Sequence, residues 1–190
     1  MNKLNNYIFR KRALKFLNEN LRVARFVNYQ AAKSVLILFE SDYSEKNPFI
    51  RQIIATMQQD GKKVVAWGFI DKKEIATSIL PDFRILHHKQ TDFFHKPIAS
   101  YCNELQLMEF DLLIDLTIRP VLPLQYFAMY ANAYCKAGMK NTDLPIYDFI
   151  LDLEKTNKDL ESEEINEIPI DEEYLFNQIF FYLKNIQTND

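Results

Sequence analysis

The chain has 190 residues, of which 48% are hydrophobic, so it can bury a core and is not intrinsically disordered. Its net charge of −3 is unevenly distributed: residues 1–33 carry eight Lys or Arg and one acid, whereas residues 141–190 carry three Lys and thirteen acids. This asymmetry predicts either a basic arm that binds a polyanion or an attraction between the two ends of the chain.

The composition disfavours secreted and membrane-spanning classes. Only two cysteines occur, Cys102 and Cys135, which is too few for a disulfide framework. No run approaches the roughly twenty apolar residues that span a bilayer. Basic residues between Arg10 and Lys15 interrupt the apolar segment that a secretory signal would need. We therefore expect a cytoplasmic protein.

The first segment, residues 1–33, is expected to be a basic helical extension, with an amphipathic helix over residues 3–27. Its predicted apolar stripe consists of Leu14, Leu17, Leu21 and Ala24. The adjoining basic face consists of Lys11, Lys15, Arg22 and Arg25. Packing of the stripe on the domain is the simpler interpretation, and binding of nucleic acid or an anionic membrane through the basic face is the alternative.

Residues 34–190 are predicted to form a single α/β domain that begins with a strand–helix–strand unit. Residues 35–39 are an unbroken apolar run, which is typical of a strand buried on both faces of a parallel sheet. A helix is expected from Asn47 and Pro48 to a stop at Gly61. The next strand is predicted at residues 63–69, with a right-handed connection between the two strands.

The middle of the chain continues to alternate between the two kinds of element. The expected order is a short helix at 71–80, a strand at 83–87, a helix at 97–107, a strand at 111–116, a helix at 124–131 and a strand at 134–139. We predict that the 111–116 strand lies beside the 35–39 strand.

The acidic end of the chain supplies three further elements. Residues 147–153 alternate as a half-exposed edge strand does, and residues 154–170 are predicted to be an exposed acidic loop. Asp171 is expected to cap a final helix over residues 171–187, with a buried stripe of Leu175, Ile179, Leu183 and Ile186. The whole pattern predicts a three-layer α/β domain with a mainly parallel sheet and helices on both faces.

Several common functional motifs are absent from the sequence. The three glycines lie far apart, so there is no dinucleotide-binding loop and no P-loop, and no cofactor is expected. There is no nucleophile motif of the G-x-S-x-G type. The histidines and Cys102 lack the spacing of zinc ligands, so we predict no metal site. We interpret the three histidines, His87, His88 and His95, as polar loop residues.

Two carboxylates follow predicted central strands, and that end of an open α/β sheet is where ligands bind. They are Asp42 and Asp115, the candidate catalytic residues. The candidate ligand-binding residues beside them are Ser41, Ser44, Thr117 and Arg119. In the alternative interpretation these groups are structural: Asp115 caps a turn and Arg119 pairs with a surface acid.

Four stretches resemble a known family: Phe-Asp-Leu-Leu-Ile-Asp-Leu-Thr at 110–117, Pro-Leu-Gln-Tyr-Phe-Ala at 123–128, Cys-Lys-Ala-Gly-Met at 135–139 and Tyr-Asp-Phe-Ile-Leu-Asp at 147–152. They are similar to an uncharacterised bacterial domain-of-unknown-function family with a basic N-terminal helix and a Rossmann-like α/β body. This resemblance implies the fold and brings no established activity with it.

The same strand–helix–strand passage is also similar to the N-terminal half of lipopolysaccharide heptosyltransferases. Those enzymes carry a Gly-Asp pair after the first strand, where this chain has Glu40-Ser41-Asp42-Tyr43. This second resemblance therefore implies the fold and not the transferase activity.

The leading hypothesis from the sequence is a non-catalytic cytoplasmic binding or interaction module, with a protein partner or a second copy of the chain as possible partners. One alternative is a transferase-like or hydrolase-like enzyme in which Asp42 or Asp115 is the general base and Arg119 holds an anionic group. The other is polyanion binding by the basic helix, which we favour less than its packing against the acidic end of the chain.

Overall fold

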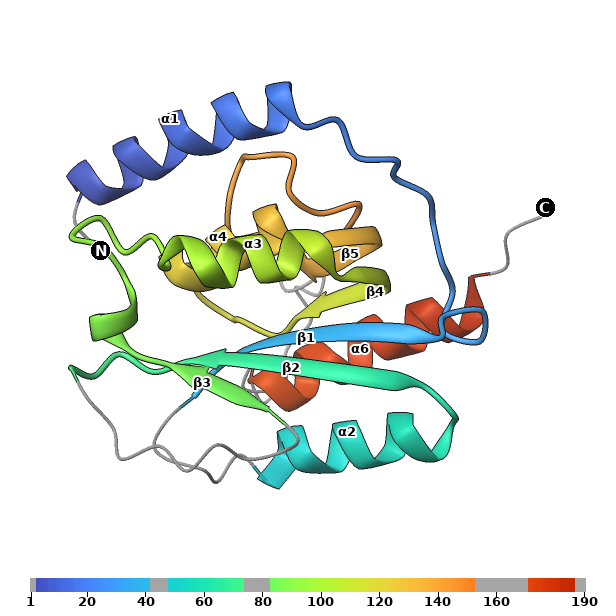
Figure 1. Ribbon diagram of the computed structural model, residues 1–190. Helices are drawn as coiled ribbons and strands as arrows, with labels where there is room; N and C mark the ends of the chain where they lie inside the picture. The colour runs from blue at the N-terminus through green and yellow to red at the C-terminus, as the bar shows by residue number, and fades with distance from the viewer. Residues whose placement is uncertain (1–2, 42–47, 74–82, 153–170, 187–190) are drawn as a thin grey trace, which may run out of the picture.

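The computed structural model describes residues 3–41, 48–73, 83–152 and 171–186. They form a six-stranded sheet in the order β3-β2-β1-β4-β5-β6, and every neighbouring pair of strands is parallel (Figure 1). The strands are β1 Ser34–Glu40, β2 Lys63–Phe69, β3 Arg84–Leu86, β4 Glu109–Asp115, β5 Asn132–Met139 and β6 Phe149–Leu151.

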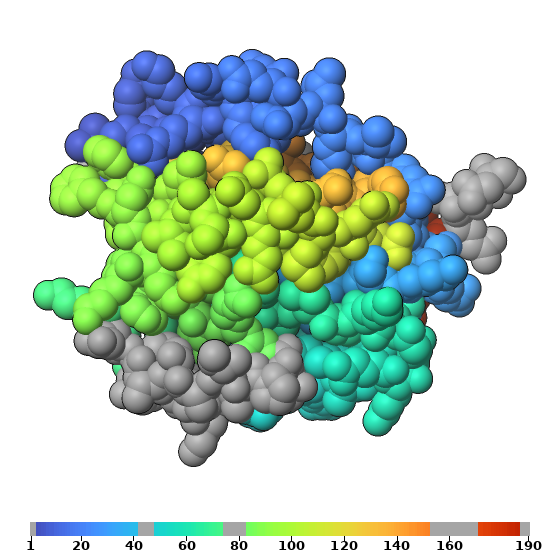
Figure 2. Space-filling model, in the orientation of Figure 1, coloured from blue at the N-terminus to red at the C-terminus, as the bar shows by residue number. Residues whose placement is uncertain are grey.

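Helices cover both faces of the sheet and confirm the predicted three-layer architecture. They are α1 Lys3–Glu19, α2 Pro48–Gln59, α3 Ala99–Leu107, α4 Leu122–Tyr130 and α6 Glu172–Asn185, with a short 3₁₀ helix η1 at His88–Gln90. Helices α3 and α4 lie on one face, whereas α2 and α6 lie on the other. Helix α1 packs outside α3 and α4 and forms one rim of the body (Figure 2). None of these helices is long and apolar enough to cross a membrane.

The centre of the sheet is the predicted strand pair. Strands β1 and β4 are paired in register from Val35 opposite Leu112 to Leu38 opposite Asp115. The five residues from Val35 to Phe39 have no exposed surface. Because side chains alternate along a strand, Leu36 and Leu38 enter one core, and the other three enter the core on the opposite face.

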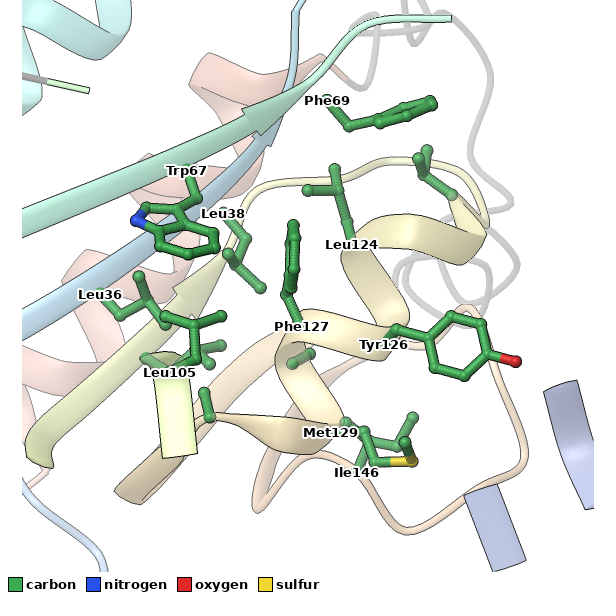
Figure 3. Close-up of a cluster of buried hydrophobic side chains, with 14 of the residues drawn as sticks. Leu36, Leu38, Trp67, Phe69, Leu105, Leu124, Tyr126, Phe127, Met129 and Ile146 are labelled. Carbon is green, nitrogen blue, oxygen red and sulfur yellow. The ribbon is translucent and has the colours of Figure 1, made fainter. Parts of the chain in front are cut away.

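The core between the sheet and α4 is rich in aromatic side chains (Figure 3). The ring of Phe127 stands edge-to-face on Trp67, with ring centroids 5.0 Å apart. Tyr126 points from the other side of α4 toward α1, where it meets Phe9 at 4.8 Å. This aromatic contact packs α1 against α4.

The predicted first helix is too long, and its predicted apolar face is wrong. Helix α1 ends at Glu19, where the side chain and backbone N–H of Asn20 both donate to the carbonyl of Phe16 at 2.9 Å. The buried face contains Asn5, Phe9 and Ala13, with Phe16 and Leu17 partly buried.

Three members of the predicted stripe are exposed: Leu14 at 43%, Leu21 at 90%, and Ala24. The spacing of the leucines predicted an apolar helical face that continues into residues 20–27. That segment is not helical, so its apolar side chains do not share a face.

The last helix differs from its prediction only at its end. Asp171 is its N-cap and accepts a hydrogen bond from the Tyr174 N–H at 2.7 Å, as predicted. The helix ends at Asn185 and not at residue 187, which leaves Ile186 exposed at the C-cap. The predicted loop at 154–170 and most of the predicted 71–80 helix lie outside the described residues, while residues 71–73 are not helical.

The observed packing can be tested by truncating one buried residue of α1 and one residue of the predicted stripe that follows the helix. Phe9→Ala should lower the free energy of unfolding by about 3–5 kcal/mol, because it leaves a cavity against Tyr126. Leu21→Ala should change the free energy of unfolding by no more than about 0.5 kcal/mol, because the side chain is in solvent. Urea denaturation measures both values, and a larger loss in Leu21→Ala would contradict the observed packing.

Candidate functional site

The order of the strands places a crevice at one edge of the sheet. From β1 the chain passes to β2 on one side, whereas β4 is followed by β5 on the other, so the segments after β1 and β4 diverge. Ligands of open α/β sheets bind at such a switch point, outside the carboxyl ends of the strands. A pocket of about 600 Å³ lies here, between the ends of β1, β2 and β4 and the start of α6.

Asp115, a candidate catalytic residue, is buried and occupied by structural hydrogen bonds. Its Oδ1 accepts from the Thr117 N–H at 2.9 Å and from the Thr117 hydroxyl at 2.8 Å, and its Oδ2 accepts from the Tyr147 hydroxyl. Burial raises the pKa of Asp115, and these donors oppose that shift. Burial and the neighbouring Asp115 also raise the pKa of Tyr147. Asp115 thus caps the turn after β4.

Thr117 belongs to the same buried network. Its hydroxyl oxygen also accepts from the Asn141 side-chain amide at 3.3 Å, and Asn141 in turn accepts from Gln125 at 3.3 Å. These bonds tie the turn after β4 to α4 and to the segment after β5. Thr117 is buried, so the structure gives it this role in place of an accessible ligand contact.

Arg119 lies across the crevice and holds Glu40. The guanidinium Nε donates to Glu40 Oε2 at 2.8 Å, and Nη2 donates to Glu40 Oε1, which is a bidentate ion pair. The hydrogen bond and charge of Glu40 raise the pKa of Arg119. Arg119 is 64% exposed and Glu40 is 19% exposed, so the pair forms a partly exposed wall of the crevice. Sequence reasoning foresaw a partner acid but did not identify Glu40.

Ser41 is the candidate ligand-binding residue that remains without a partner. Its backbone N–H continues the β1–β2 ladder to the Phe69 carbonyl at 2.8 Å. Its side chain lines the pocket and is only 3% exposed, and its hydroxyl oxygen has no hydrogen-bond partner in the described part of the chain. The other two candidates in this segment, Asp42 and Ser44, lie outside the described residues.

We call this crevice the acidic pocket, because carboxylates outnumber basic groups among its lining residues. Five acids line it and two basic residues oppose them. The acids are Glu40, Asp71, Asp171, Glu172 and Glu173, and the basic residues are Lys72 and Arg119. The N-terminal end of α6 contributes a partial positive charge of about half a unit, which is smaller than the formal excess of three negative charges.

A smaller pocket of about 250 Å³ adjoins it on the other side of the Glu40–Arg119 pair. We call it the histidine pocket, because the rings of His88 and His95 line it with centroids 5.5 Å apart. His88 Nε2 is hydrogen-bonded to Asp71 Oδ1. The prediction of polar loop histidines is therefore incomplete, because His88 lies in η1 and both rings line a pocket.

His95 is held in an uncommon backbone conformation. Its φ is +62°, in the left-handed region that non-glycine residues seldom adopt. Asp92 enforces this turn by accepting from the backbone N–H groups of Phe94 at 2.8 Å and Lys96 at 2.9 Å. The turn directs the imidazole toward His88. Among the described residues, no three His, Cys, Asp or Glu side chains are arranged to hold a metal ion.

A third pocket, of about 530 Å³, lies between α1 and the segment after β5. Several of its polar groups are paired with one another, Gln125 with Asn141 and Arg10 with Asp143 at 3.4 Å, and none of its described lining residues has a buried polar side-chain atom without a partner. The two pockets at the switch point, in contrast, hold buried polar atoms without partners, so we place the candidate site there.

The four candidate polyanion-binding residues do not form one helical face, because Arg22 and Arg25 follow the end of α1. Arg22 donates to the carbonyls of Ala133 and Tyr134 at 2.9 Å and to Asp148 at 2.6 Å. Arg25 stacks on the Tyr134 ring at 4.1 Å. Only Lys11 and Lys15 remain on an exposed helical surface, and Lys15 lies 3.9 Å from Glu19.

The expected attraction between the two ends of the chain is present. Arg10 pairs with Asp143 and Arg22 pairs with Asp148, which joins the basic first segment to the acidic last segment. The exposed Arg10 pair stabilises the fold little, whereas the less exposed Arg22 group contributes more through its hydrogen bonds.

A simple positional signal would have identified the residues that sequence reasoning missed. Glu40, Asp71 and His88 each lie at or within two residues of the carboxyl end of a strand at this edge of the sheet. Asn5 and His95 have no such signal, because α1 and the Asp92 turn bring them in from elsewhere.

Comparison with known proteins identifies a family. A family model described as a family of unknown function, DUF6913, matches residues 5–168, which agrees with the resemblance found in the sequence. No curated protein and no solved structure matches the chain significantly.

The role of Asp115 predicts an unusual dependence of stability on pH. Because its pKa is raised in the folded state, the stability that it contributes is complete below its ordinary pKa of about 4 and is lost as the pH rises through the folded value. Asp115→Asn cannot ionise and can still accept from Thr117. Its free energy of unfolding, relative to the natural protein, should therefore rise between pH 4 and pH 8 in urea denaturation.

Asp111 on the same strand is the matched control with the opposite sign. Burial opposes ionisation of Asp111, but hydrogen bonds from the Lys33 and Ser34 backbone outweigh it and lower the pKa of Asp111. Its contribution is present above its ordinary pKa and lost as the pH falls through the folded value. Asp111→Asn should thus become relatively less stable as the pH rises. Equal pH profiles for the two variants would contradict the structural role of Asp115.

Arg22 provides a test of internal packing against polyanion binding. Arg22→Ala should lower the free energy of unfolding by about 1.5–3 kcal/mol, as expected for loss of charge-assisted hydrogen bonds, whereas Lys11→Ala should change it by less than about 0.5 kcal/mol. Binding of RNA, DNA or anionic vesicles should be weak at physiological salt. Tight binding in that salt that is lost in the Lys11, Lys15, Arg22 and Arg25 quadruple alanine variant, with the fold intact, would overturn this interpretation.

Proposed function

The chain belongs to DUF6913, a family of unknown function, and we propose that it is a non-catalytic binding module that takes a small cationic molecule in the acidic pocket. The observation that carries this proposal is the Ser41 hydroxyl, which is buried at the switch point and has no partner in the described part of the chain.

An unpartnered buried hydroxyl is costly. Leaving such a group without a hydrogen bond costs about 1–3 kcal/mol, and most buried polar groups in proteins are paired. Ser41 lines a pocket of about 600 Å³, which lies within the size range of small-molecule sites. A ligand that donates an N–H or O–H to this oxygen would remove the cost.

The charge of the pocket favours a cation. Its five carboxylates exceed its two basic groups, and Glu40 already neutralises Arg119. Glu173 has no hydrogen-bond or ionic partner within the described residues, so its charge is available to a ligand. A phosphate or nucleotide would meet net repulsion here, whereas an ammonium group would be attracted.

Binding is favoured over catalysis by the state of the candidate catalytic groups. Asp115 accepts three hydrogen bonds below the surface and has no exposed oxygen to act as a general base. Arg119 is held by Glu40 and not aimed at an anion in the pocket. An enzyme using Asp42 or Asp115 is the alternative, and polyanion binding is opposed by the internal contacts of Arg22 and Arg25.

We also place this binding in the cytoplasm. Cys102 and Cys135 are both free and buried, as expected for a protein that folds in a reducing compartment. Burial raises the pKa of both thiols, to about 11 for Cys102, which keeps them protonated and inert.

The proposal predicts that stability and affinity change independently at Ser41. Ser41→Ala should leave the free energy of unfolding unchanged or raise it by up to about 1 kcal/mol, because no hydrogen bond is lost. The same variant should bind butylamine about threefold to tenfold more weakly, since the ligand loses one hydrogen bond. Urea denaturation and isothermal titration calorimetry give the two values.

Charge variants complete this test. Glu173→Gln should weaken butylamine binding by about twofold to fivefold, as expected for one exposed charge, and should make it less dependent on salt. Glu19→Gln is the matched control, because Glu19 lies at the end of α1, away from the acidic pocket. The proposal fails if butylamine does not bind the natural protein, or if Ser41→Ala and Glu173→Gln bind it as tightly as Glu19→Gln does.

A further inference from the structure

We infer that the ligand is dipolar, an amino-carboxylate whose ammonium group lies in the acidic pocket and whose carboxylate lies in the histidine pocket, across the Glu40–Arg119 pair. This inference rests on the proposed function and adds the second half of the ligand.

The two pockets are parts of one site. Both are lined by Glu40, Asp71 and Arg119, which come from the ends of three different strands. Arg119 donates hydrogen bonds from Nε and Nη2 to Glu40, and this bidentate geometry fixes the plane of the guanidinium. Its Nη1 group has no acceptor among the described residues and is free to donate to a carboxylate at this wall.

His95 supplies a second donor that the protein does not use. Its ring contacts His88 but has no hydrogen-bond partner in the described part of the chain. The Asp92 turn holds it at a φ of +62°, a strained conformation that is common at ligand sites. His88, in contrast, is fixed by Asp71. Arg119 and His95 therefore both line the histidine pocket, and Nη1 and the imidazole N–H are donors that no described residue uses.

Asn5 gives an independent indication that a ligand belongs here. It is 7% exposed, lines the histidine pocket from the first turn of α1, and its Oδ1 is buried without a partner. A half-turn of the side-chain amide exchanges Oδ1 for Nδ2, so Asn5 can meet either an acceptor or a donor on the ligand. A polar residue is costly on the buried face of α1, where Phe9 and Ala13 follow it, unless a ligand pairs with it.

The balance of charges decides between a dipolar ligand and a simple anion. Within the histidine pocket Arg119 is neutralised by Glu40, and the carboxylate of Asp71 lies beside His88, so carboxylates outnumber Arg119 in the lining. A phosphate would bring its charge there without compensation. A carboxylate attached to an ammonium group in the adjoining acidic pocket brings no net charge. The ammonium group meets carboxylates, and the carboxylate meets the N–H donors of Arg119 and His95.

Three matched probes test this inference: butylamine, butanoate and 4-aminobutanoate, together with the 3-, 5- and 6-carbon homologues of the amine and of the aminocarboxylate. At least one aminocarboxylate should bind the natural protein about tenfold more tightly than the amine of the same length, the effect of one charge-assisted hydrogen bond. Butanoate and inorganic phosphate should bind most weakly. Isothermal titration calorimetry at constant ionic strength measures all of these affinities.

Two variants separate the halves of the site. His95→Asn keeps a residue that tolerates the left-handed conformation but withdraws the imidazole, so it should abolish the advantage of the aminocarboxylate and leave butylamine affinity unchanged. Glu173→Gln should weaken the amine and the aminocarboxylate by the same factor. If aminocarboxylates bind no better than amines, or if phosphate binds more tightly than either, the dipolar ligand is wrong while amine binding still supports the acidic pocket. If no amine binds, the proposed function itself fails.

Discussion

The pairing of β1 with β4 at the centre of the sheet is the constraint on which the other features depend. Both strands are buried on both faces, so helices must cover both sides, and the chain has to leave the two strands in opposite directions. The divergence opens the crevice at their carboxyl ends. Glu40 and Ser41 at the end of β1, and Asp115 and Arg119 at the end of β4, are brought together there because the two strands are neighbours.

Residues of one chemical type have separate roles at this edge. Asp115 is covered by Tyr147 and caps a turn, whereas Glu40 reaches the surface and holds Arg119. The Glu40–Arg119 pair then divides the edge into a pocket with excess carboxylates and a pocket with two imidazoles. The hydrogen bonds and ion pairs that a group makes within the protein, more than its residue type, therefore decide whether it is available to a ligand. Ser41 and Asn5 are distinctive because each lines one of the two pockets and buries a polar oxygen that has no partner among the described residues.

Helix α1 links the N-terminal segment to this site. The contact of Phe9 with Tyr126 packs the helix against α4. Ion pairs of Arg10 with Asp143 and of Arg22 with Asp148 attach the segment to the acidic last part of the chain. The basic charge thus meets internal carboxylates, and the helix carries Asn5 to the histidine pocket. The charge asymmetry of the sequence is explained in part by contacts within the chain, with the aromatic contact positioning the helix and the ion pairs adding modestly.

The sequence alone determined the features that local physical chemistry decides. Residues near one another in the chain determine the apolar runs of β1 and β4, the end of α2 before Gly61 with its positive φ, and the Asp171 cap. These local features were enough to predict the fold class, and the four sequence stretches were enough to suggest the family. Tertiary structure alone decided the length and buried face of α1, the covering of Asp115 by Tyr147 and the meeting of Asn5, His88, His95 and Arg119. These depend on contacts between residues far apart in sequence, which neither periodicity nor spacing encodes, because side chains are brought together by packing and not by their order in the chain.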